Sequence, residues 1–136
     1  MKHRSVLLSE TDFASLNTLI DGLKLSPSDD SDRLRVLEAE LESAEVLKGR
    51  QMPSNVVRMN SQVHVLDLGS GDDTVYTLVY PQEADMDRHR VSVLAPLGAA
   101  LLGSRVGQVI TPMTPRGRRR LRVGAIVYQH DAVPAA

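Results

Sequence analysis

The sequence predicts an α+β fold in which a short N-terminal antiparallel helical hairpin precedes a small antiparallel sheet domain with one short helix. Two patterns carry this prediction. Apolar side chains in residues 9–48 recur at helical spacings of three and four, whereas apolar and polar side chains alternate over short runs after residue 57. Glycine and proline separate those runs, as expected of strands joined by tight turns. A chain of 136 residues fits one domain with a small appendage.

Two amphipathic helices are expected in the N-terminal third. Ser9 is placed to cap the first helix, with Asp12 three residues further on. The second is expected to run to about Lys48, before Gly49. The apolar stripes are Phe13, Leu16, Ile20 and Leu23 in the first helix and Leu34, Leu37, Leu41, Ala44 and Leu47 in the second. Matching stripes joined by a short polar loop predict a coiled-coil hairpin, with arms roughly 20 to 30 Å long at the usual helical rise.

The rest of the chain is predicted to form strands. We expect them at residues 57–59, 62–68, 74–80, 91–94, 108–111 and 118–128. The turns between neighbouring strands favour antiparallel pairing. Aromatic residues are scarce and Trp is absent, so the core must rest on Leu, Val and Ile.

One apolar run, Leu94-Ala-Pro-Leu-Gly-Ala-Ala-Leu-Leu-Gly103, organises the C-terminal part. Pro96 suits the first position of a short helix, and Gly103 suits the left-handed residue that closes it. The helix between them has no charged side chain, so it is either buried or a docking surface. We expect Leu101 and Leu102 in the core and leave Leu97 open between core and contact.

Composition excludes several classes of function. The formal net charge is −1, so the chain as a whole does not attract nucleic acid. The absence of cysteine removes disulfides, thiol nucleophiles and thiolate metal sites. We expect a cytoplasmic protein, because neither a signal peptide nor a membrane-spanning apolar segment is recognisable. The four histidines lack the spacing of metal ligands, so we expect no metal site and no cofactor.

The segment Val65-Leu-Asp-Leu-Gly-Ser-Gly71 resembles the glycine-rich first motif of methyltransferases that use S-adenosylmethionine. That motif requires a helix after the glycine turn. Here the following residues are typical of a strand, so we favour a hairpin turn over a nucleotide-type site.

Two charged clusters have alternative interpretations. The arginines could contact nucleic-acid phosphates, but we favour a solvated edge hairpin because no aromatic residue is interleaved for base stacking; they are Arg116, Arg118, Arg119, Arg120 and Arg122. The acidic cluster at the turn between the helices could hold a divalent cation, but we favour a turn-forming role; it consists of Asp29, Asp30 and Asp32.

Several segments together resemble a known family. They are Met52-Pro-Ser-Asn-Val-Val-Arg-Met-Asn-Ser-Gln-Val63, Tyr76-Thr-Leu-Val-Tyr-Pro81 and Ser92-Val-Leu-Ala-Pro-Leu-Gly-Ala-Ala-Leu-Leu-Gly-Ser-Arg-Val-Gly107. Over nearly its whole length the chain resembles the regulator of nucleoside diphosphate kinase family, a relative of the bacterial Gre transcript-cleavage factors.

The resemblance implies an N-terminal coiled coil in residues 1–52 and an FKBP-like C-terminal domain in residues 53–136. It implies a monomeric, non-enzymatic regulator that binds bacterial RNA polymerase at the rim of the secondary channel and touches DNA or RNA at most indirectly. The short hairpin suggests competition with Gre factors without stimulation of transcript cleavage. The effect on the kinase would then be indirect, through transcription.

The resemblance also implies where the polymerase contact lies. In the Gre factors the turn before the short helix touches the polymerase, with an acidic residue two positions before a proline. Pro96 matches that proline, but Leu94 stands at the acidic position. We therefore assign the contact to Leu94, Ala95, Pro96, Leu97 and Gly98. Asp29, Asp30 and Asp32 stand where the Gre factors carry acidic tip residues. A nucleic-acid-binding module built on the arginine hairpin remains the alternative function.

Overall fold

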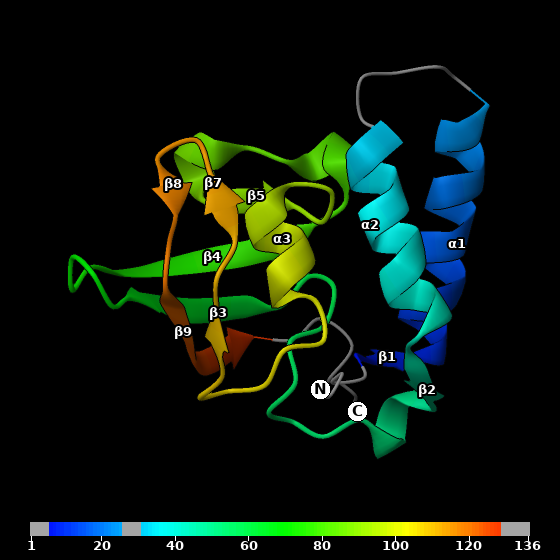
Figure 1. The fold of residues 1–136 in the computed structure, drawn as a ribbon. Helices are drawn as coiled ribbons and strands as arrows, with labels where there is room; N and C mark the ends of the chain where they lie inside the picture. The colour runs from blue at the N-terminus through cyan, green and yellow to red at the C-terminus, as the bar shows by residue number, and fades with distance from the viewer. Residues whose placement is uncertain (1–5, 26–30, 129–136) are drawn as a thin grey trace.

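The computed structural model describes residues 6–25 and 31–128 (Figure 1). Its strands are β1 (Leu7–Ser9), β2 (Glu45–Leu47), β3 (Gln62–Asp67), β4 (Asp73–Val79), β5 (Arg90–Ser92), β6 (Val109–Ile110), β7 (Met113–Thr114), β8 (Gly117–Arg118) and β9 (Leu121–Tyr128). Its helices are α1 (Glu10–Lys24), α2 (Ser31–Glu42) and α3 (Pro96–Leu101), with short 3-10 helices η1 (Gly49–Gln51), η2 (Pro81–Glu83) and η3 (Met86–Arg88). The predicted α+β class is confirmed.

The main sheet is mixed rather than wholly antiparallel. Among the described strands its order is β5-β4-β3-β9-β6. The neighbours β3/β4, β3/β9 and β6/β9 pair antiparallel as predicted, but β4 and β5 pair parallel, with Leu78 opposite Val91. The prediction is wrong there because the η2–η3 segment is long enough to return the chain before β5 begins, and a parallel pair needs such a crossover.

The glycine-rich segment forms the turn of the β3–β4 hairpin, as we favoured. The Gly71 N–H donates to the Asp67 carbonyl at 2.7 Å, and Gly71 has φ of +82°, a conformation that glycine adopts without strain. A strand follows this turn, so the strand–turn–helix arrangement of the methyltransferase motif is absent at this place.

Three expected elements differ from the structure. The strand expected at residues 118–128 is divided into β8, which pairs with β7, and β9 in the main sheet. The second helix ends at Glu42, and Glu45–Leu47 instead forms β2, which pairs parallel with β1. The N–H of Glu45 donates to the Val6 carbonyl at 2.9 Å, so pairing with the N-terminal segment takes the place of a further helical bond. Residues 57–59 form no strand: the N–H of Val57 donates to the Ser104 carbonyl after α3 at 2.8 Å, but the pairing there is limited to one isolated bridge between Val56 and Arg105.

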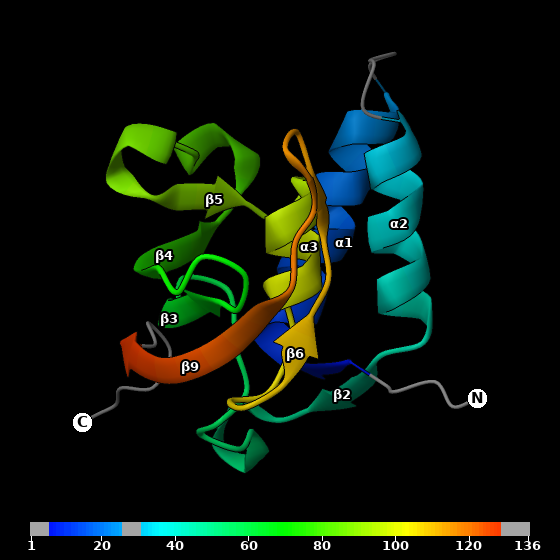
Figure 2. The ribbon, with the colours of Figure 1, turned by 60° about the vertical axis from the view of Figure 1, so that its left-hand side comes forward.

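The helical pair and the sheet share one apolar core. Figures 1 and 2 show α1 and α2 side by side, with α3 between α2 and the main sheet. A single buried cluster joins Leu16 and Leu37 of the helices to Val63 of β3. Ser9 caps α1 as predicted, accepting from the Asp12 N–H at 3.1 Å. The Asp12 carboxylate reaches across and accepts the Met59 N–H at 3.0 Å.

The short helix α3 has the predicted ends. Pro96 occupies its first turn, and Gly103 follows its C-cap with φ of +75°. Leu101 and Leu102 are buried as expected, and Leu97 is half-buried. Gly98 is buried, and an added Cβ would overlap the carbonyl oxygen of Ser92. Only glycine therefore lets α3 pack this closely against the end of β5.

The two helical glycines Gly98 and Gly22 give a matched test of this packing. We expect Gly98→Ala to lower the free energy of unfolding by about 1–3 kcal/mol through overpacking. Gly22→Ala should raise it by up to about 1 kcal/mol, because nothing lies within 4 Å of its Cβ position. Urea denaturation of both variants measures the difference. Equal losses of stability would contradict the close approach of α3 to β5.

Candidate functional site

The five residues predicted to contact a partner divide into two kinds. Leu94 is only 6% exposed, and Gly98 is also buried, so both hold the turn rather than face solvent. Pro96 is exposed, and Ala95 and Leu97 are half-buried. The turn itself is fixed by the Leu94 N–H, which donates to the Ser92 hydroxyl at 3.0 Å.

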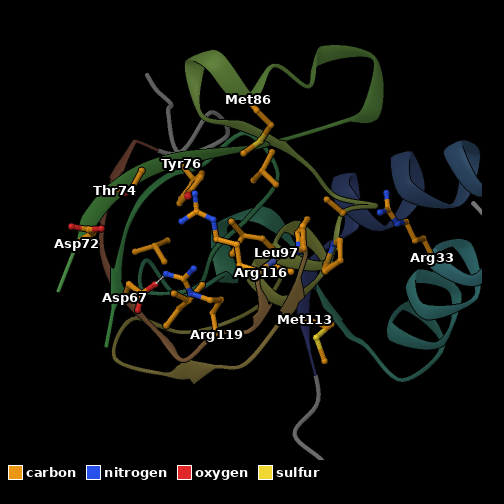
Figure 3. Close-up of a pocket in the computed structure, with 17 residues that line it drawn as sticks. Arg33, Asp67, Asp72, Thr74, Tyr76, Met86, Leu97, Met113, Arg116 and Arg119 are labelled. Carbon is orange, nitrogen blue, oxygen red and sulfur yellow. Dashed lines mark hydrogen bonds and ion pairs between the residues drawn. The ribbon is translucent and has the colours of Figure 1, made fainter. Parts of the chain in front are cut away.

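The exposed part of this turn forms one wall of a cavity of about 620 Å³. Ala95, Pro96 and Leu97 line it from the start of α3. The other lining residues come from α2, the main sheet, η3 and the β7–β8 hairpin (Figure 3): Arg33, Val65, Asp67, Asp72, Thr74, Tyr76, Met86, Val91, Met113, Thr114, Pro115, Arg116, Arg119 and Leu121.

The cavity combines an apolar floor with a rim of methionine and arginine. Val65, Val91 and Leu121 are core residues whose side chains form the floor. Met86 and Met113 at the rim are 57% and 51% exposed. Large exposed apolar groups around a hollow are typical of a binding surface. Methionine is flexible enough to adapt its shape to a partner.

Asp67 and Arg119 form an ion pair inside this cavity, marked by the dashed line in Figure 3. The Asp67 carboxylate also accepts the N–H of Gly69 at 2.8 Å and that of Ser70 at 3.1 Å. The Arg119 guanidinium, together with these backbone N–H groups, holds the pKa of the Asp67 carboxyl below its usual value. One carboxylate thus fixes both the β3–β4 turn and an arginine of the basic cluster.

The basic cluster is partly used within the fold. Arg119 is bound to Asp67, and an Nη of Arg118 donates to the Thr111 carbonyl at 2.8 Å. Arg116, Arg120 and Arg122 are exposed. Arg116 belongs to the cavity, whereas Arg120 and Arg122 do not line it.

The acidic tip can be followed only in part. Asp29 and Asp30 lie outside the described residues, and Asp32 is exposed in the first turn of α2. No group of three potential metal ligands occurs within residues 6–25 and 31–128. Lys24 at the end of α1 pairs with Glu38 at 2.5 Å, and this partner raises the pKa of Lys24. Across the described part of the chain, no helix has the length and apolar character needed to cross a membrane.

The sequence marked two parts of the cavity lining, residues 95–97 and the arginines Arg116 and Arg119, but it did not bring them together and did not mark the rest. Arg33, Met86 and Met113 come from elements far apart in the chain, and no local pattern marks them. Tyr76 had a weaker signal, since period two places it on the same face of β4 as Thr74.

Comparisons with known proteins match both parts of the chain. The family described as Rnk N-terminus matches residues 4–47, and that described as transcription elongation factor, GreA/GreB, C-term matches residues 52–128. The regulator of nucleoside diphosphate kinase of Escherichia coli (strain K12) is 35% identical over 97% of this chain and 96% of its own length. The transcription elongation factor GreA of Orientia tsutsugamushi (strain Boryong) is 36% identical over 68% of this chain but 58% of its own length.

Two solved structures resemble the fold. A prokaryotic transcription elongation factor GreA/GreB from Nitrosomonas europaea has a TM-score of 0.75 and 35% identity, covering 90% of this chain and 99% of that one. The GreA factor homolog 1 of Thermus thermophilus has a TM-score of 0.50 and 27% identity, with coverage of 90% and 99%.

The Asp67–Arg119 pair predicts how stability depends on pH. The pKa of Asp67 is lowered on folding. The ionised Asp67 carboxylate therefore stabilises the folded state above the pKa of the unfolded chain, about 3.9, and this stabilisation is lost as pH falls through the folded-state pKa. Arg119→Ala should therefore be less stable than the parent at neutral pH, and the difference should shrink in acid. Thermal unfolding across this range measures it, with the exposed Arg120→Ala as control. A difference that stays constant with pH would contradict the assignment.

Proposed function

This chain belongs to the regulator of nucleoside diphosphate kinase family, and on that premise we propose that it is a transcription regulator that binds bacterial RNA polymerase at the rim of the secondary channel. Its C-terminal part is related to the C-terminal region of GreA and GreB. The observation that carries the proposal is the cavity wall formed by Pro96 and Leu97, at the position that the resemblance to the Gre factors indicates.

The rigidity of this surface supports a docking role. Leu94 and Gly98 are buried on either side of Pro96 and Leu97, so the two contact residues are presented on a fixed turn. A preordered surface loses little conformational entropy when a partner binds. The lack of an acidic residue at Leu94 favours an apolar contact made by its neighbours Pro96 and Leu97, with Met113 beside them on the rim.

The length of the helical pair supports a role without cleavage stimulation. The 15 residues of α1 and the 12 of α2 correspond to lengths of about 22 and 18 Å. Part of that length lies beside α3 in the shared core. We propose that the end of the pair that carries Asp32 remains too far from the polymerase's catalytic metal to act on it; Asp29 and Asp30 lie outside the described residues. The protein then occupies the channel entrance and competes with Gre factors.

The proposal also covers the domain division, the oligomeric state and the effect on the kinase. The division at residues 52 and 53 separates a coiled-coil hairpin from an FKBP-like domain. The protein acts as a monomer and is not itself an enzyme. The effect on nucleoside diphosphate kinase arises through transcription rather than through contact with the kinase.

We expect charged substitutions at Pro96 and Leu97 to weaken RNA polymerase binding strongly. Pro96→Arg and Leu97→Asp introduce opposite charges, so a loss in both indicates that an apolar contact has been removed. Each should weaken binding by at least about tenfold, as for residues central to an interface. Val127→Arg, a change at an exposed apolar residue of β9, is the control. Co-purification and titration against RNA polymerase measure the effect, and thermal unfolding checks that the variants fold. Unchanged binding in both folded variants would overturn the docking surface.

We further expect no transcript cleavage above the polymerase's own rate. Backtracked complexes incubated with this protein should keep their RNA length. Added before GreA, the protein should slow GreA-stimulated cleavage in a concentration-dependent way, and Pro96→Arg should not. RNA shortening by the protein alone would contradict the argument from helix length. Full GreA activity at saturating wild-type protein would contradict competition.

A further inference from the structure

The cavity beside α3 has the size and lining of a small-molecule site. Its volume is about 620 Å³, within the range of roughly 300–1,000 Å³ typical of ligand pockets. Buried Val65, Val91 and Leu121 form the floor, and half-buried Tyr76 and Leu97 stand as walls. Such a floor favours an apolar body, aromatic or aliphatic.

The charges at its mouth are unbalanced. The Asp67 carboxylate is already bound by Arg119. Arg116 is exposed, and within residues 6–25 and 31–128 it forms no ion pair. Figure 3 shows its side chain reaching over the cavity toward Tyr76. Asp72, the other carboxylate of the lining, lies at the outer edge of the cavity in Figure 3, away from Arg116. The mouth therefore offers a guanidinium to an incoming anion.

The turn in which Arg116 lies explains why this residue faces the cavity. It lies in the tight β7–β8 turn, where Gly117 has φ of +104°. The Thr114 hydroxyl donates to the Gly117 carbonyl at 2.8 Å and accepts the Arg116 N–H at 3.3 Å. These bonds fix the backbone of the turn beside the apolar floor.

We propose that this cavity binds a small amphiphilic anion, whose apolar body lies on the Val65–Val91–Leu121 floor and whose carboxylate, sulfonate or phosphate head pairs with Arg116. The exposed Met86 and Met113 are available at the rim to contact the body, since methionine adapts readily to irregular shapes. Arg33 on the α2 side adds positive charge to the rim. The site stands whether or not the protein binds RNA polymerase.

The ligand has a consequence for the proposed function. Pro96 and Leu97 belong to the same cavity, so an occupied cavity changes the surface that we assign to polymerase docking. The ligand and the polymerase then compete. This consequence rests on the proposed function, whereas the binding site itself does not.

The test compares two probes of nearly equal shape, naphthalenesulfonate and naphthalenesulfonamide, which differ in charge. We expect calorimetry with the whole chain to show one site for the sulfonate and at least about tenfold weaker binding of the neutral sulfonamide, because a charge-assisted hydrogen bond is lost. Amide resonances of Tyr76, Leu97 and Arg116 should shift on titration. Absence of saturable sulfonate binding at millimolar concentration, or shifts confined to other residues, would overturn the site.

Two arginine variants separate the specific pairing from general positive charge. Arg116→Gln should remove the preference for the sulfonate, whereas Arg120→Gln, an exposed change outside the cavity, should preserve it. Equal effects of the two variants would overturn the role of Arg116. Adding the sulfonate to a polymerase-binding assay tests the competition. If the sulfonate binds but polymerase does not, the proposed function fails while the ligand site stands.

Discussion

The arrangement of the molecule depends on one core shared by the helical pair and the sheet. Leu16 and Leu37 are buried in the same cluster as Val63, and this burial supplies the main favourable free energy of the contact. Asp12, only 5% exposed, sits at the same boundary and accepts the backbone N–H of Met59. A buried carboxylate without such a donor would be strongly unfavourable, so the bond fixes one relative position of the two parts.

The cavity follows from that position. With α3 held between α2 and the sheet (Figure 2), the start of α3 faces the β7–β8 hairpin across the floor of the sheet. Asp67 determines which arginine of the cluster is bound within the fold. It binds Arg119 and the β3–β4 turn together, which leaves the neighbouring Arg116 at the mouth. The two proposals, docking and ligand binding, thus concern a single surface.

Local chemistry made part of this structure predictable. Pro96, Gly103 and the Ser9 cap act within one turn of chain, and each was found where the sequence placed it. The parallel β1–β2 pair was not predictable in this way, because residues 45–47 carry a helical spacing that tertiary pairing overrides. The Asp67–Arg119 pair joins residues 52 positions apart, beyond any periodic signal. The sequence therefore indicated the turn around Pro96 and the arginine cluster separately, but not the cavity that they share.

The shared core also governs what the acidic end of the helical pair can reach. A helical pair attached by a flexible linker could swing toward a distant group, so its length alone would not limit it. Here the buried Leu16 and Leu37, together with Asp12, hold the pair against the body that carries Pro96. Once Pro96 is docked, the position of Asp32 is determined by the fold and by helices of about 20 Å. In our proposal, the rigid attachment and the short length of the helical pair, rather than its acidic charge, explain why the protein occupies the channel entrance without stimulating cleavage.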